Sequence, residues 1–159
     1  MKGEISLLIL IILLLIGIAF SGLNKAEAQV MLDMNIIATI ESSNNPLAYN
    51  ARSGATGKFQ ITSVCLQDFN DYHKHKYKLK EMFEEDKCFK VSSWYMNVRI
   101  PAMLKYYKRQ DTIKNRLWSY NAGIGLLVRG VMPRETEQYI KNYTERKNNG
   151  RKSVENRIS

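Results

Sequence analysis

An apolar helix that ends at a carboxylate and a proline-bounded turn is the feature that most limits how this chain can fold. Three isoleucines recur at helical spacing over residues 36–40, and Asn-Asn-Pro at residues 44–46 supplies a stop signal. Glu41 falls between them, on the helix face that carries Ile37 and Ile40. The sequence therefore predicts a helix that brings one carboxyl group to the border of the core.

The position of Glu41 predicts a general acid. A carboxyl group held against apolar side chains resists ionisation, so its pKa rises and it keeps its proton near neutral pH. A lone Glu at the end of a helix more commonly turns back to water, and only its neighbours can decide between these interpretations. Asp33 precedes it on the same face, and its backbone lies about 12 Å away along the helix axis. Paired glycosidase carboxyls lie about 5 to 9.5 Å apart, so Asp33 is expected to start the helix instead.

A glycine-rich loop follows the helix. Gly54 and Gly57 allow the backbone to approach a ligand closely, while Ser53 and Gln60 present groups that can bond sugar hydroxyls and acetamides. A plain turn would use the same glycines, so these residues alone do not decide between a turn and a binding loop.

A second group of polar residues lies far downstream. Tyr120 and Asn121 combine a flat apolar ring with an amide, which suits a pyranose ring and its N-acetyl group. A core tyrosine and a helix-capping asparagine would look the same. Glu135 is expected to open a further helix through residues 139–143, where the helix dipole alone would favour it.

These residues belong to blocks that occur in a fixed order. The blocks are E-S at 41–42, N-P-L-A at 45–48, S-G-A-T-G-K-F-Q-I at 53–61, Y-N-A-G at 120–123 and E-T-E-Q-Y at 135–139. Together they resemble the catalytic half of the soluble-type lytic transglycosylases, the goose-lysozyme-like cell-wall enzymes. The resemblance covers roughly residues 31–143. Two positions depart from the family pattern, because Lys58 replaces an apolar residue and Asn50 stands where many members have Ser.

The resemblance implies a mainly α, lysozyme-like fold with a small β-ribbon near residues 54–60. It implies cleavage of the β-1,4 bond between N-acetylmuramic acid and N-acetylglucosamine, with a 1,6-anhydromuramic product and no metal or other cofactor. The alternatives are a muramidase-type hydrolase with the same cleft and a non-catalytic peptidoglycan-binding or assembly protein. Glu41 would be the single general acid and base, and the substrate would be bound by Ser42, Asn50, Ser53, Gln60, Tyr120, Asn121 and Glu135.

The chain of 159 residues divides into three expected parts. Residues 1–28 hold an apolar run followed by Ala-Glu-Ala, which is typical of a signal peptide and fits a cleaved signal better than a retained membrane anchor. Residues 29–143 form the domain, and residues 144–159 are expected to be a basic disordered tail. The protein is therefore expected to be exported to the periplasm or cell envelope.

The formal net charge is +9, and residues 1–28 hold two charges of each sign, so the exported part carries all of it. Such a charge suits an anionic polymer, although much of it is expected to be an ordinary solvated surface. Export argues against nucleic acid as a partner. Peptidoglycan strands fit, and the sequence leaves open both anchoring to the membrane and an association with secretion or conjugation machinery.

Three further features bear on the core. Cys65 and Cys88 are the only cysteines, and an exported protein could hold them as a disulfide or as two buried thiols. His-Lys-His-Lys at 73–76 is expected to be exposed and is not a metal site, because cations alternate with the imidazoles. An apolar stripe over residues 94–107 predicts a core helix despite its proline, and its members are Tyr95, Val98, Met103, Leu104 and Tyr107.

Overall fold

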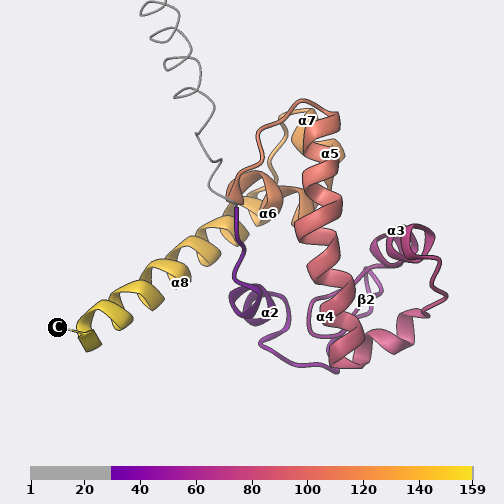
Figure 1. The fold of residues 1–159 in the computed structure, drawn as a ribbon, viewed down its shortest axis with the longest axis horizontal. Helices are drawn as coiled ribbons and strands as arrows, with labels where there is room; N and C mark the ends of the chain where they lie inside the picture. Colours follow the sequence, from indigo (N-terminus) through magenta and orange to yellow (C-terminus); the bar gives the residue numbers. More distant parts are fainter. Residues whose placement is uncertain (1–29, 159) are drawn as a thin grey trace, which may run out of the picture.

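The computed structural model describes residues 30–158 and is mainly helical (Figure 1). The expected export segment, residues 1–28, lies outside the described residues. Between residues 30 and 158, none of the helices combines the length and the apolar character needed to cross a membrane. The described elements follow one another as α2 (Met34–Ser42), β1 (Tyr49–Asn50), β2 (Ala55–Thr56), α3 (Ser63–His73), the 3-10 helix η1 (Leu79–Phe83), α4 (Glu85–Trp94), the π-helix η2 (Tyr95–Arg99), α5 (Ile100–Tyr106), α6 (Ile113–Ala122), α7 (Ile124–Val128) and α8 (Arg134–Ile158).

The predicted helix before the glycine-rich loop is α2. Asp33 caps its N-terminus, because a carboxylate oxygen accepts hydrogen bonds from the backbone N–H groups of Asn35 and Ile36 at 3.0 and 3.3 Å. The helix ends where Ser43 and Asn44 take left-handed conformations with φ of 56° and 63°. Both the helix and the helix-start role of Asp33 are confirmed.

A small β-ribbon is present, but its first strand begins at Tyr49, ahead of the predicted range of residues 54–60. Strands β1 and β2 pair antiparallel, with Tyr49 opposite Thr56, and an isolated bridge then joins Thr56 to Ile61. Gly57 follows β2 with φ of 80°, and a side-chain carbon there would lie 2.0 Å from the carbonyl oxygen of Met82 in η1. Only glycine therefore lets the ribbon pack this closely on η1.

The main core lies where five helices meet. It is filled by fully buried side chains from α2, α3, α4, α6 and α8, namely Ile37, Phe69, Val91, Leu117 and Tyr143. Each large apolar side chain buried in this way contributes about 1.5 to 3 kcal/mol. Cys65 and Cys88 also lie in this core, and both are free thiols. Of the two possibilities that the sequence left open, a disulfide or two buried thiols, the structure has the second.

Helices α4, η2 and α5 run on as one long helix across the domain (Figure 1). Its buried residues in and after η2 are Met96, Ile100 and Leu104, whereas Val98 and Tyr107 are 46% and 45% exposed. The predicted core helix is correct, but the prediction that Val98 and Tyr107 belong to its apolar stripe is wrong. In η2 the N–H of residue 100 bonds the carbonyl of residue 95, and this wider turn shifts which side chains face the core.

The last helix, α8, joins the domain and then extends away from it (Figure 1). The Tyr143 hydroxyl accepts a hydrogen bond of 2.7 Å from the backbone N–H of Asp33, which ties α8 to the start of α2. The expectation of a disordered tail at residues 144–159 is wrong for its described part, because α8 continues to Ile158. Its Glu, Arg and Lys residues are good helix formers, and Lys141 and Glu145 pair along its exposed face at 3.9 Å.

Candidate active site

A groove of about 550 Å³ opens between the C-terminal end of α2, the β-ribbon, the start of α3, the end of α6 and the start of α8. Segments far apart in the sequence therefore meet there. Seven of the eight predicted site residues line it: Glu41, Asn50, Ser53, Gln60, Tyr120, Asn121 and Glu135.

The Glu41 carboxyl is partly buried at the end of α2. The Tyr139 hydroxyl, on the first turns of α8, donates a hydrogen bond of 2.7 Å to its Oε1 atom. Burial raises the pKa of Glu41 from its ordinary value of 4.5 to about 7, although the bond from Tyr139 acts in the opposite direction and nearby Glu135 adds to the rise. Near neutral pH this carboxyl exists in both its protonated and its ionised form, which is what proton transfer in either direction requires.

The ribbon residues of the groove are held by the turn that they form. The Asn50 side-chain oxygen accepts hydrogen bonds from the backbone N–H groups of Arg52 and Ser53 at 3.0 and 3.3 Å. Gln60 takes a φ of 51°, and its amide nitrogen donates to the carbonyl of Gly57 at 3.0 Å. These contacts fix the groove wall and keep its polar groups in place.

Tyr120 and Asn121 line the groove from the end of α6. The Tyr120 hydroxyl donates to the carbonyl of Phe59 at 2.6 Å, which joins α6 to the ribbon. The Asn121 side-chain oxygen accepts a bond of 2.6 Å from the Thr136 hydroxyl. Within the described residues the amide nitrogen of Asn121 has no partner, so it remains a free donor for a ligand.

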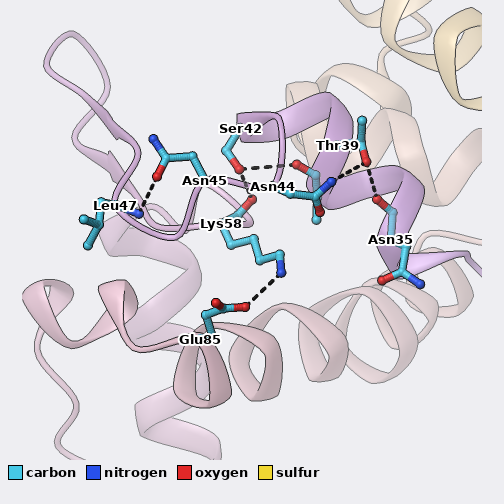
Figure 2. Close-up of polar contacts among 9 residues, drawn as sticks. Asn35, Thr39, Ser42, Asn44, Asn45, Leu47, Lys58 and Glu85 are labelled. Carbon is cyan, nitrogen blue, oxygen red and sulfur yellow. Dashed lines mark hydrogen bonds and ion pairs between the residues drawn. The ribbon is translucent and has the colours of Figure 1, made fainter.

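Ser42 is the predicted site residue that the structure does not bring to the groove. Its hydroxyl donates to the carbonyl of Lys58 at 2.8 Å, so it fastens the ribbon to the end of α2 (Figure 2). The Lys58 side chain extends the other way and pairs with Glu85 at the start of α4, with Nζ and Oε2 2.8 Å apart (Figure 2). The charged residue that departs from the family pattern thus has a partner on α4.

Several residues that shape this site were not predicted to belong to it. Tyr139 bonds Glu41, and Thr136 bonds Asn121, and both lie within the first turns of α8. The spacing of Glu135 and Tyr139, four residues apart, could have indicated that both reach the same site. Ser119 also lines the groove with a buried hydroxyl that has no partner among the described residues.

No protein-family model, no curated protein and no solved structure matches this chain. In residues 30–158, no three His, Cys, Asp or Glu side chains gather closely enough to hold a metal ion. The chemistry of the groove is therefore inferred from the side chains that line it.

Proposed function

We propose that this protein is an exported peptidoglycan lytic transglycosylase with a lysozyme-like fold. It would cleave the β-1,4 bond between N-acetylmuramic acid and N-acetylglucosamine. One observation carries the proposal: a partly buried carboxyl with a pKa of about 7 lies in a groove that also gathers Gln60, Tyr120 and Asn121. The order of the motif blocks, which resembles that of the soluble-type lytic transglycosylases, supports the same function.

In the proposed reaction Glu41 transfers a proton twice. The protonated carboxyl first donates its proton to the oxygen that bridges the two sugars, and positive charge develops at the anomeric carbon as that bond breaks. The resulting carboxylate then accepts the proton of the C6 hydroxyl of the same sugar, whose oxygen closes the 1,6-anhydro ring. Glu41 ends in its protonated form, so one group completes the cycle.

Tyr139 sets the balance between the two proton transfers. Burial favours the protonated form of Glu41, whereas the hydroxyl of Tyr139 favours the ionised form by donating to Oε1. Because the two effects oppose each other, the carboxyl remains able both to give and to take a proton near neutral pH. Without this donor the pKa of Glu41 would be higher, so its protonated form would be a weaker acid in the first step.

The groove suits an aminosugar strand. Its volume falls within the range of about 300 to 1,000 Å³ that ligand pockets commonly have. The free amide nitrogen of Asn121 can donate to an acetamide oxygen, and the Tyr95 and Tyr120 rings supply apolar surface beside it.

A hydrolase is the second candidate, and one observation favours it. Glu135 is the other carboxylate that lines the groove in the described structure, and it is exposed at the start of α8. A second, exposed carboxylate beside the catalytic acid could activate a water molecule. The products separate the two reactions, because the transglycosylase gives anhydro-muropeptides and the hydrolase gives reducing ends.

The test is a mass spectrum of the products released from purified sacculi by the parent protein and by the Glu41→Gln variant. General acid catalysis contributes about 10² to 10⁴ in rate, so the variant should lose at least about a hundredfold in activity. Glu137→Gln, the same change at an exposed position of α8, is the control and should act as the parent does. Unchanged lysis by Glu41→Gln would remove Glu41 from the mechanism. Binding without any cleavage by the parent would favour the peptidoglycan-binding protein instead.

A further inference from the structure

Arg52 is the only positively charged residue among the described residues that line the groove. It lies in the turn between β1 and β2 and is exposed. The side-chain oxygen of Asn50 and the paired strands hold the backbone of this turn, so the position from which the guanidinium extends is fixed.

The guanidinium of Arg52 has no partner in the described part of the chain. No carboxylate there lies within 4.0 Å of it, and none of its side-chain nitrogens donates a hydrogen bond. The other two charged residues of the groove, Glu41 and Glu135, are therefore not neutralised by it. By contrast, Arg99 and Arg116 pair with Asp68 and Asp111.

An unpaired guanidinium at a ligand groove favours a particular chemical group. Its planar fork of N–H donors matches a carboxylate, which it can bind through two parallel hydrogen bonds. A neutral sugar hydroxyl carries no negative charge that the guanidinium could attract. The groove thus carries a recognition element that a strand of uncharged aminosugars would not require.

We propose that Arg52 selects muramic acid units by binding a carboxylate on their substituent. This inference rests on the proposed function, since it assigns the substrate strand to the same groove. Two sources supply that group: the stem peptide, or the lactyl group itself where the peptide has been removed. Arg52 would therefore distinguish peptidoglycan from chitin-like strands, which carry the same acetamides and no carboxylate.

The test measures binding in the Glu41→Gln background, so that cleavage does not enter. The ligands are peptide-bearing glycan strands, strands stripped of peptide, and chito-oligosaccharides. Adding Arg52→Ala should weaken binding of a carboxylate-bearing strand about fivefold and change chito-oligosaccharide binding less than about twofold. Arg52→Lys should fall between, because it keeps the charge and loses the fork. Arg146→Ala, which removes the same charge from the exposed face of α8, is the control and should bind all three ligands as before.

The strand that loses affinity identifies the carboxylate. A loss confined to peptide-bearing strands assigns it to the stem peptide, and a loss confined to stripped strands assigns it to the lactyl group. An equal loss for chito-oligosaccharides, or no loss for any ligand, would overturn the role of Arg52 and leave the proposed function standing. Failure of the Glu41→Gln protein itself to bind any of the three ligands would overturn both.

Discussion

Replacing Glu41 by Gln should stabilise the protein above pH 7 and should not do so at pH 4. The pKa of Glu41 is raised from 4.5 to about 7 in the folded state. Below pH 4.5 the folded and unfolded chains both hold this proton, so the group makes no difference. Between pH 4.5 and 7 the folded chain keeps a proton that the unfolded chain has released, so stability falls as the pH rises. Above pH 7 the folded chain bears the full free-energy cost of holding the ionised carboxylate of Glu41 out of water.

The size of this effect follows from the two pKa values. One pKa unit between the folded and unfolded states corresponds to about 1.4 kcal/mol, so the cost above pH 7 is about 3 kcal/mol. Glutamine has nearly the same shape, remains uncharged and can still accept the hydrogen bond from Tyr139. The increase in the free energy of unfolding caused by Glu41→Gln should therefore be about 3 kcal/mol larger at pH 8 than at pH 4. In a domain of this size that corresponds to roughly 10 °C in melting temperature.

Thermal and urea unfolding of the parent and the variant at pH 4 and pH 8 would measure this difference. Comparing the two pH values removes any change in packing that the substitution causes. Glu145→Gln is the control, because that carboxylate is exposed and its ion pair with Lys141 spans 3.9 Å. A gain of the same size at both pH values, or no gain at pH 8, would show that the carboxyl of Glu41 is not held out of water.

Two other substitutions test the surroundings of the site. Tyr139→Phe removes the donor that favours the ionised form of Glu41, so the pKa of Glu41 should rise further and the alkaline limb of the activity profile should move to higher pH. An NMR titration of the carboxyl measures this directly, and an unchanged or lower pKa would contradict the role given to Tyr139. Gly57→Ala should destabilise the fold by more than about 3 kcal/mol in urea unfolding, because its new carbon meets a backbone carbonyl in η1. Gly130→Ala is the control, with φ of 72° and no atom within 4 Å, and should cost only about 1 kcal/mol. Equal losses for the two glycines would contradict the predicted clash.

The parts of the fold that the sequence predicted depend on local signals. The capping carboxylate of Asp33, the isoleucines of α2 and the stop near residue 44 lie within about three helical turns, and the structure has all of them. The ribbon was implied by the resemblance of the motif blocks, and Gly54 and Gly57 have the positive φ values that its turns require. Such signals act between neighbours in the chain, so a sequence displays them directly.

The parts that were missed depend on contacts between distant residues. Tyr139 reaches Glu41 across 98 positions, and Tyr120 reaches the ribbon across 61. The spacing of Glu135 and Tyr139 can indicate that Tyr139 reaches the site, but it does not identify Glu41 as the partner, and nothing near Tyr120 identifies Phe59. The π-helix η2 changed which residues of the long helix are buried, because the predicted stripe assumed the spacing of a regular α-helix throughout. The free thiols of Cys65 and Cys88 could not be told from a disulfide without their geometry.

Helix α8 holds both ends of α2, through Tyr143 at Asp33 and through Tyr139 at Glu41. A ribosome makes Glu41 early and Tyr139 only 98 residues later. A nascent or truncated chain that lacks α8 would leave this acid hydrated, with a strength close to that of acetic acid and little ability to protonate a glycoside at neutral pH. Docking of α8 is thus the step that gives Glu41 the surroundings of a working acid.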